Sequence, residues 1–578
     1  MSGRPAAIVV LGERSLALAR RVQAALPGAV IHGFAGRVSG ADRQFEDFGT
    51  ALRQLFADEV PIVAISAAGI VIRALAPLLK DKRAEPPVLA LAEDGSAIVP
   101  LLGGLRGVNA LARAIASALG TAPAITTSGE VRFAATLEHP PAGYDLRNPR
   151  DAKRFMSDLL AGERVKLSGA APWLSGSRLP FDPEGSLALT ITPREREAGA
   201  RELLFHPHSV AVAIAAPRPD LSRLVLEALA RHGLSPRAVA VVLAAEDHSA
   251  RPEIHAAAAL LARPLRLLPI SATAAEEEVA ASLVQSAVPA PAEGPFVEGP
   301  IAIAVAAAPI AADAIGRGRG KLTVVGLGPG AAGWLAPDAR KALDEAEDIV
   351  GYASYLGLAG PFRADQAIHA SDNREEMERA RLAFALAARG RRVAVLSSGD
   401  PGIFAMATAV MEALDRSDDP AWQGVELAVV PGISAAHAAA ARAGAPLGHD
   451  FCVLSLSDNL KPWEVIEARL RLAATADLAL ALYNPLSQAR PWQFGRALEV
   501  IREQRTPETP VVLGRNIGRA GESVRVLPLG ELTPADVDMR TTIIVGSSTT
   551  RSFPRLAGGR WVYTPRWYGK PPGPLSGS

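Results

Sequence analysis

Cysteine is almost absent from this chain, since Cys452 is the single one among 578 residues. One thiol can form neither a disulfide framework nor a cysteine-rich metal site. Excess charge is lacking too, because 61 Lys and Arg stand against 60 Asp and Glu, for a net charge of +1. Such a balance gives no general affinity for nucleic acid or for a membrane surface.

Long hydrophobic runs are also missing. The longest apolar stretch, residues 301–312, is about half the length needed to span a bilayer. The opening MSGRPAAIVVLGERS holds too short an apolar run for a signal peptide, and its residues predict a first β-strand. We therefore expect a soluble, cytoplasmic protein with neither membrane nor nucleic acid as partner.

The composition that is present is typical of packed domains, with 49% hydrophobic and 21% charged residues. At ~150 residues per domain, the length predicts about three or four domains. Strand-like runs alternate with helix-like runs in two regions, 1–135 and 206–286, which indicates parallel βαβ units. These strand-like runs are 7–11, 61–66, 87–92, 209–215, 239–244 and 264–270.

The remaining boundaries follow composition. Residues 136–205 are polar and rich in Pro, Gly and Arg, which favours a small middle module or linker. Residues 287–320 form a Pro/Gly/Ala stretch that we interpret as a linker. A third α/β region covers 321–550, and a basic aromatic tail covers 551–578. The fold class is therefore α/β and multidomain.

The third region opens with KLTVVGLGPGAAGW, a β-branched strand that runs into Gly326, Gly328 and Gly330 around Pro329. Glycines at such a turn let the backbone approach a ligand closely. Taken alone the turn is weak evidence. A dinucleotide-binding turn, with Ala331 and Asp348 in the remaining roles, and a plain strand–helix turn both stay open.

Four similar strand ends follow in order, at SGDPG (398–402), PGIS (431–434), YNP (483–485) and RTTIIVGSSTT (540–550). Ligands in open α/β sheets bind outside the carboxyl ends of strands, where we place each of these turns. Singly, Asp400 could simply cap a helix and YNP could be an ordinary turn. His437 and His449 have no acidic or cysteine partner at ligand spacing, so we expect no metal.

This ordered set resembles the tetrapyrrole methylases, which use S-adenosylmethionine (SAM) on corrin precursors. The resemblance implies a two-lobed class III SAM methyltransferase over 321–550, with SAM as cofactor, a tetrapyrrole as substrate and a homodimer as the assembly. It also implies cofactor contacts at the matching turn positions, which are Gly328, Pro329, Gly330, Gly399, Asp400, Ser434, Ala435, Asn484 and Thr542.

Residues 449–490, GYASYL (351–356) and YTPRWY (563–568) are similar to the branch that methylates C(17) of precorrin-3B while contracting the ring. Ring contraction moves protons, so an Asp or His could assist. Ser457, Asp458 and His449 lie in that run and are our catalytic candidates. Methylation at another ring position, a cobalt-bearing substrate and a non-catalytic corrinoid carrier are the alternatives.

The N-terminal half, through residues 64–130, resembles the cobalt-precorrin-5A hydrolases, and we expect hydrolase-like α/β units at 1–135 and 206–286. Where that family has a histidine after a Gly-Gly turn, this chain has Leu105 or Arg106. Leucine cannot transfer a proton. Two later turns carry a cysteine and a lysine in that family. In this chain the matching segments, 212–219 and 246–252, contain neither residue. We therefore expect a tethered module without hydrolysis, in which Lys82 and Asn109 could still bind carboxylates. A relic fold that is kept only for solubility is the alternative.

Overall fold

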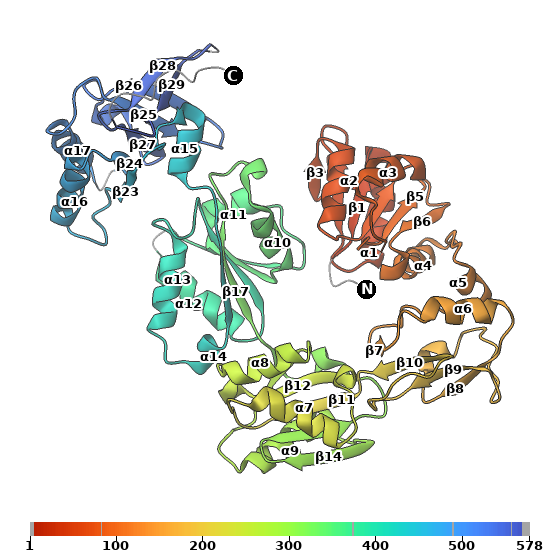
Figure 1. The fold of residues 1–578 in the computed structure, drawn as a ribbon. Helices are drawn as coiled ribbons and strands as arrows, with labels where there is room; N and C mark the ends of the chain where they lie inside the picture. The colour runs from red at the N-terminus through yellow and green to blue at the C-terminus, as the bar shows by residue number, and fades with distance from the viewer. Residues whose placement is uncertain (1–4, 83, 373–374, 488–489, 557, 569–578) are drawn as a thin grey trace.

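The computed structural model describes residues 5–82, 84–372, 375–487, 490–556 and 558–568, and within them the chain forms six β-sheets. In Figure 1 the larger sheets follow one another along the chain, from the red N-terminal end to the blue C-terminal end. The expected α/β multidomain class is confirmed.

The first domain is a six-stranded sheet with helices on both faces. Its strands lie in the order β3-β2-β1-β4-β5-β6, and all neighbours are parallel except β5 and β6. Helices α1 and α4 pack on one face, and α2 and α3 on the other. The strands are β1 (Ala7–Val10), β2 (Val30–Phe34), β3 (Arg43–Phe45), β4 (Ile62–Ile65), β5 (Val88–Leu91) and β6 (Ile98–Leu102). The helices are α1 (Leu16–Ala25), α2 (Phe48–Ala57), α3 (Ala68–Leu75), α4 (Val108–Leu119) and α5 (Ser128–Phe133).

The second domain occupies the region that the sequence left as a module or a linker. It is a four-stranded sheet in the order β7-β10-β9-β8, with a core built around Phe133, Phe155 and Phe205. Residues 136–205 are therefore a folded module and not a linker. Its elements are β7 (Tyr144–Leu146), α6 (Ala152–Leu160), β8 (Val165–Ser168), β9 (Leu187–Ile191) and β10 (Glu202–Pro207).

The third domain is a six-stranded sheet, β14-β15-β11-β12-β13-β16. The prediction of a linker at 287–320 is wrong, because these residues supply β14, β15 and β16, which pair antiparallel with their neighbours. Pro295 is tolerated because β14 is an edge strand. The elements are β11 (Val210–Ile214), α7 (Leu221–Arg231), β12 (Val239–Ala245), α8 (Pro252–Leu260), β13 (Leu265–Leu268), α9 (Glu276–Ala287), β14 (Glu293–Glu298), β15 (Ile301–Val305) and β16 (Arg317–Gly318).

The C-terminal half has two lobes. The first lobe is a fully parallel sheet in the order β19-β18-β20-β17-β21, with helices on both faces. The three central strands, β18, β20 and β17, are buried on both sides, as expected for a parallel sheet, whereas the edge strands β19 and β21 are partly exposed. The elements are β17 (Lys321–Gly326), α10 (Pro337–Glu345), β18 (Asp348–Tyr352), α11 (Ala353–Ala359), β19 (Ala367–Ser371), α12 (Glu376–Ala387), β20 (Arg392–Ser397), α13 (Met406–Asp415), α14 (Pro420–Gln423) and β21 (Glu426–Val430).

The second lobe is a mixed sheet, β23-β24-β27-β25-β26, with a small three-stranded sheet β22-β29-β28 beside it. The basic tail therefore contributes β28 and β29, while 557 and 569–578 lie outside the described residues. The elements are α15 (Ala435–Ala443), β22 (Gly444–Ala445), β23 (Phe451–Ser455), α16 (Trp463–Thr475), β24 (Ala479–Tyr483), α17 (Gln493–Arg502), β25 (Pro510–Arg515), β26 (Ser523–Pro528), β27 (Thr541–Val545), β28 (Arg551–Pro554) and β29 (Arg560–Tyr563).

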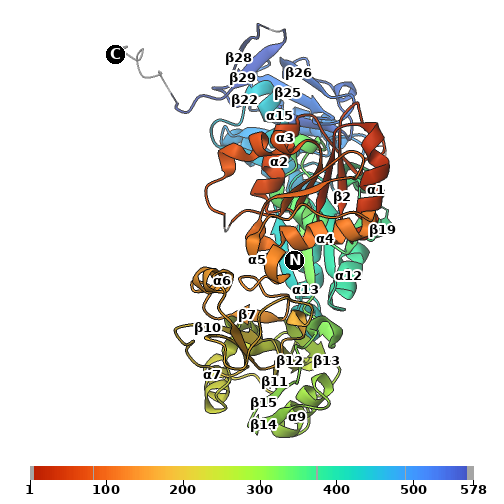
Figure 2. The same cartoon turned by 90° about the vertical axis from the view of Figure 1, so that its right-hand side faces the viewer.

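The chain folds back on itself. Figures 1 and 2 both place the N-terminal domain beside the C-terminal half, and Arg43 on β3 forms an ion pair with Asp344 on α10. The third domain meets the first lobe where Ser249 donates to the carbonyl oxygen of Pro420 at 3.1 Å. The N-terminal half is therefore in contact with the first lobe through two different domains.

Candidate functional site

A cleft lies between the two lobes of the C-terminal half. It has a volume of about 820 Å³, within the range of small-molecule sites. The carboxyl ends of β17, β20, β21, β24 and β25 all open onto it. Thr541 and Thr542 begin β27 instead of following it, and they reach the same edge because β27 runs antiparallel to β24 and β25.

Most of the predicted cofactor positions lie in this cleft. Its wall includes Pro329, Gly399, Asp400, Ser434, Ala435, Asn484 and Thr542. Gly328 and Gly330 are not part of the wall itself, but they flank Pro329. Seven positions spread over more than 200 residues of sequence are therefore brought together in space.

The turns that form the cleft floor pack backbone against backbone. Gly328 and Gly399 both have positive φ, at 65° and 66°, and their amides exchange hydrogen bonds of 3.1 and 2.8 Å. Glycine is favoured at such angles because a Cβ is strained there. A Cβ on Gly432 would lie well inside contact distance of the carbonyl oxygen of Gly399. These glycines therefore set the shape of the floor.

Asp400 joins two of the turns. One carboxylate oxygen accepts from the amide of Gly402 at 2.9 Å, and the other accepts from the amide of Gly432 at 3.1 Å. Its carboxylate thus satisfies backbone donors that would otherwise be left at the turn. Helix capping was the alternative role expected for Asp400 from the sequence. The structure shows it bracing the floor while its residue also faces the cleft.

Arg519, which the sequence analysis missed, crosses from the second lobe to the first. Its Nε donates to the carbonyl oxygen of Pro329 at 2.6 Å, and its Nη2 donates to Ser398 Oγ at 2.9 Å. The neighbouring Gly518 packs on the Pro329 ring. These contacts hold the two lobes together beside the GPG turn. The glycine-flanked arginine in GRNIGRAG (514–521) was the signal available in the sequence.

The second lobe positions further polar groups. The hydroxyl of Tyr483 accepts from the amide of Ala436 at 2.8 Å, which fixes the start of α15. Asn484 donates to Ser455 Oγ at 3.0 Å. Ser434 caps α15, and its Oγ lies 2.7 Å from Nδ1 of His437. His437 is therefore a helix residue bonded to the turn, as the sequence interpretation favoured.

The opposite wall of the cleft comes from α11 and α12 of the first lobe. Arg379 is buried there, and it donates to Ser371 Oγ at 2.8 Å and to the carbonyl oxygen of Asp372 at 2.6 Å. Burial lowers the pKa of Arg379 and raises the pKa of the nearby Tyr355 hydroxyl. A buried cation and a neutral phenol therefore line the side away from the second lobe.

The catalytic candidates lie outside the cleft wall and do not form one group. Ser457 and Asp458 follow the carboxyl end of β23, where Asp458 accepts from Gln493 at 2.9 Å. His449 precedes the amino end of the same strand, and its ring packs edge-on against Tyr568. At ~3.3 Å per residue, the five residues of β23 keep the two ends more than ~13 Å apart.

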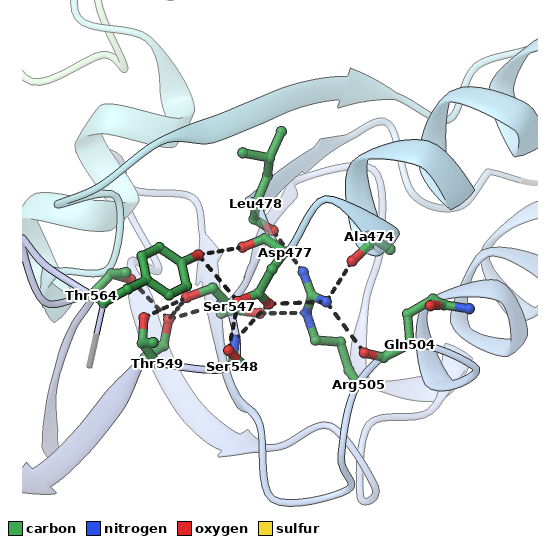
Figure 3. A network of polar contacts seen from close by, with 12 residues as sticks. Ala474, Asp477, Leu478, Gln504, Arg505, Ser547, Ser548, Thr549 and Thr564 are labelled. Carbon is green, nitrogen blue, oxygen red and sulfur yellow. Dashed lines mark hydrogen bonds and ion pairs between the residues drawn. The ribbon is translucent and has the colours of Figure 1, made fainter. Parts of the chain in front are cut away.

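The edge opposite the cleft is held by a polar network around Asp477 (Figure 3). Asp477 accepts from the amide of Ser548 at 2.9 Å and from the Tyr568 hydroxyl at 3.1 Å. The buried Arg505 reaches the same carboxylate at 3.2 Å and donates to the carbonyls of Ala474 and Leu478 at 2.6 and 3.0 Å. Through Tyr568, the network attaches the basic tail to the second lobe, which explains part of the YTPRWY run.

In the N-terminal domain, the hydrolase-like positions are used internally. Asn109 is buried and donates to Glu130 at 2.9 Å, so its amide faces a carboxylate of the protein. Arg106 pairs with Glu59 at 3.0 Å. Lys82 is exposed and lies near His139. A cavity of about 370 Å³ at the ends of β4 and β5 is lined by Ser66, Glu93, Val99 and alanines.

Among the described residues, no three or more His, Cys, Asp or Glu side chains lie together in a group that could hold a metal ion. No helix in the described ranges has the length and apolar character needed to cross a bilayer.

Comparison with known proteins places the cleft in a class. Residues 321–533 match the tetrapyrrole (corrin/porphyrin) methylases. A relative from Sinorhizobium sp is 52% identical over 250 residues, which cover 43% of this chain and 97% of the relative. The chain therefore belongs to the tetrapyrrole methylase family. Methylases of this family use S-adenosylmethionine, so the chain is a SAM-dependent methyltransferase.

The similarity to particular known proteins lies in the C-terminal half of the chain. The Sinorhizobium protein is a precorrin-3B C(17)-methyltransferase. The cobalamin biosynthesis protein CobIJ of Mycobacterium bovis is 51% identical over 261 residues, or 44% of this chain, which spans half of that relative. A crystal structure of the methyltransferase CobJ shares 50% identity and covers 43% of this chain and 100% of its own, with a TM-score of 0.40.

The N-terminal resemblance is also supported by a family match. Residues 50–130 match the family described as cobalamin synthesis G N-terminal. That match includes β4, β5, β6, α3 and α4 of the first domain. The expected fusion of a hydrolase-like region with a methylase is therefore confirmed.

Proposed function

We propose that this methyltransferase transfers a methyl group from SAM to C(17) of precorrin-3B, with ring contraction, in cobalamin biosynthesis. The observation that carries the proposal is the cleft itself, in a half of the chain 52% identical to a whole precorrin-3B C(17)-methyltransferase. The sulfonium of SAM supplies an activated methyl group. Transfer to an electron-rich ring carbon needs mainly in-line positioning and exclusion of water.

The cofactor contacts that we propose are the floor and the second-lobe rim of the cleft. Backbone atoms of Gly328, Pro329, Gly330 and Gly399 would approach SAM closely, because no Cβ stands between them and the cleft. Asp400, Ser434, Ala435, Asn484 and Thr542 complete the set. The proposal is supported by their convergence on one cavity large enough for a small molecule.

The position of Asp458 supports a role in ring contraction better than the position of His449 does. Asp458 follows the strand end that neighbours Tyr483 and Asn484, whereas His449 stands at the far end of β23 beside the Asp477 network. Ser457 lies next to Asp458 and donates its amide to Ser455 Oγ at 3.3 Å. We therefore propose that Asp458 and Ser457 donate or accept protons during ring contraction. Ser455 connects them to the cleft residue Asn484, because its Oγ accepts hydrogen bonds from both Ser457 and Asn484.

The direct test uses SAM labelled with ¹³C in its methyl group, precorrin-3B and the full-length chain. We expect a product one methyl group heavier, with the label at C(17). Label at another ring carbon, or methylation only of a cobalt-bearing precursor, would move the substrate assignment to the runner-up. Retention of tetrapyrrole without any SAM binding would instead support the carrier alternative.

We propose that the N-terminal half does not hydrolyse a lactone and acts as a tethered module. Support comes from Leu105 and Arg106 at the histidine position and from the engagement of Asn109 with Glu130. A tether raises local concentration to about millimolar for a short linker, so weak retention of a macrocycle could still increase flux. Acetaldehyde released from a lactone-bearing corrinoid by the purified chain would contradict this proposal.

We also propose that the methylase half forms a homodimer and that the protein acts in the cytoplasm. Val465 and Leu472 lie seven residues apart on one face of α16 and are exposed, Leu472 by 71%. An exposed apolar face of this kind fits an interface between copies. Light scattering should give twice the chain mass, and Leu472→Arg should reduce it. A monomeric mass for the unaltered chain would contradict the dimer.

A further inference from the structure

Phe404 has a conformation that its own packing does not explain. It lies in the turn between β20 and α13, where its backbone has a φ of 52°. The left-handed region costs a side chain with a Cβ about 1 kcal/mol or more, so it persists only where something else requires it. The ring gains little burial in return, since Phe404 is 50% exposed on the wall of the cleft.

The ring is nevertheless held in a defined place. Its centroid lies 5.6 Å from that of Tyr483, with the planes at 65°, which is a favourable edge-to-face geometry. Tyr483 is in turn fixed by the amide of Ala436, next to the proposed cofactor residues Ser434 and Ala435. The exposed aromatic surface is therefore positioned relative to the site of the methyl donor.

A cation stands over the same ring. Nζ of Lys461 lies 5.6 Å from the Phe404 centroid. In the described part of the chain neither Lys461 nor Arg540, which lines the same cleft, has an acidic partner at ion-pair distance. Burial, and the nearby Arg469, lower the pKa of Lys461. An ammonium that is partly desolvated and lacks a carboxylate within the protein is well placed to receive one from a ligand.

From this juxtaposition we propose that Phe404 is the apolar platform for one face of the tetrapyrrole ring and that Lys461 pairs with one of its carboxylate arms. The inference rests on the proposed function, because it assumes a flat, carboxylated macrocycle in this cleft. It adds the residues that select such a ligand. The apolar face of the macrocycle meets the aromatic surface of Phe404, and a charged arm at the rim of the macrocycle meets the cation of Lys461.

The test measures binding of two ligands separately, with the full-length chain. Uroporphyrin III serves as a stable carboxylated tetrapyrrole, titrated by its absorbance in the presence of S-adenosylhomocysteine, and SAM is titrated by calorimetry. For Phe404→Ala we expect the uroporphyrin Kd to rise about tenfold to a hundredfold. The SAM Kd should stay within about twofold, and Phe404→Tyr should restore most of the tetrapyrrole affinity.

The second variant tests the charge. Lys461→Gln should weaken uroporphyrin binding about fivefold at low salt, and the deficit should shrink as salt rises, because exposed charges are screened. Lys461→Arg should bind nearly as the unaltered chain does. A matched aromatic control is Phe553→Ala, since Phe553 is 48% exposed and meets Tyr563 edge-to-face at 6.0 Å on β28. Lys166→Gln, on the exposed side of β8, is the matched charge control.

Each outcome is decisive. Unchanged tetrapyrrole affinity in Phe404→Ala, or a loss as large in Phe553→Ala, overturns the platform. Weakened SAM binding with intact tetrapyrrole binding assigns Phe404 to the cofactor instead, which also overturns it. Failure of the proposed function looks different, because the unaltered chain would then bind uroporphyrin or SAM poorly and transfer no methyl group to precorrin-3B.

Discussion

The N-terminal domain and the first methylase lobe build a strand-end edge in the same way, yet the two edges differ in content. Both are largely parallel sheets with helices on both faces and turns at the carboxyl ends of central strands. The N-terminal edge holds a cavity of about 370 Å³ lined mostly by alanine. The methylase edge holds about 820 Å³ and is lined by residues of both lobes.

The difference shows that the carboxyl-terminal edge of a parallel sheet forms a binding cleft where a second lobe covers it. Arg519, Tyr483 and Thr542 come from the second lobe and face turns of the first. The cavity of the N-terminal domain is lined by that domain's own residues. Its polar groups Asn109, Arg113 and Glu130 bond to one another instead of facing a cavity.

The largest effect should come from a methyl group added in the floor of the methylase cleft. Gly432→Ala places a Cβ against the carbonyl oxygen of Gly399, where the backbone has to move. We expect SAM binding and methyl transfer to be lost, by about a hundredfold or more, measured by calorimetry and product formation.

The N-terminal domain offers a matched substitution. A Cβ on Gly103 would meet the carbonyl oxygen of Pro86 just as closely, and Gly103 also has a φ of 76°. Gly103→Ala should lower the melting temperature of the N-terminal domain while SAM binding stays unchanged. Equal losses of SAM affinity in the two variants would break the comparison.

The next effect in size concerns the carboxylates of the two edges. Asp400→Ala frees the amides of Gly402 and Gly432, and we expect SAM affinity to fall about tenfold to a hundredfold while the circular dichroism of the chain is kept. Asp94 is the matched control, because it accepts from the amide of Ser96 at 2.9 Å in the N-terminal domain. Asp94→Ala should leave SAM affinity alone.

A smaller effect is expected at the contact between the lobes. Arg519→Gln removes the charge that bridges Pro329 and Ser398, so the second lobe should hold the GPG turn less firmly. We expect kcat/KM for SAM to fall about fivefold to tenfold, or about 1–1.4 kcal/mol. Steady-state kinetics would check this, and a variant with unchanged kcat/KM would show that the lobes need no such contact.

The smallest effect on activity should come from the edge opposite the cleft. Burial alone raises the pKa of Asp477, but the hydrogen bonds from Ser548 and the charge of Arg505 hold that pKa below its usual value. Asp477→Asn should cost about 2 kcal/mol of the free energy of unfolding and leave methyl transfer intact.

The pH dependence of that loss has a defined sign. A lowered pKa in the folded state stabilises the protein above the unfolded value, near pH 4, and the stability is lost as pH falls through the folded value. In denaturant titrations, the difference in the free energy of unfolding between the unaltered chain and Asp477→Asn should therefore be complete at pH 7. It should become smaller below about pH 4. A gap that widens in acid would contradict the role given to Asp477.

The sequence predicted what local turn chemistry determines. Gly328, Gly399 and Asp400 lie at strand ends, which glycine and aspartate indicate by themselves, and strands β1, β4 and β5 are short apolar runs in the sequence. It failed where tertiary pairing decides. Pro295 made residues 293–298 look like a linker, although they form the edge strand β14. Arg519 forms its hydrogen bond with Pro329, which lies 190 positions away in the sequence. The left-handed backbone of Phe404 follows from no preference of phenylalanine.

Hydrogen–deuterium exchange of the full-length chain with and without SAM tests most directly whether the chemistry belongs to the methylase edge. Bound ligand slows the opening of the backbone that it contacts. We predict protection at 326–330, 397–402, 431–436 and 541–542, and unchanged exchange at 66–69 and 88–99 of the N-terminal domain. The account would be contradicted if SAM protected the N-terminal segments. It would also be contradicted if SAM did not change the exchange rates at the methylase turns.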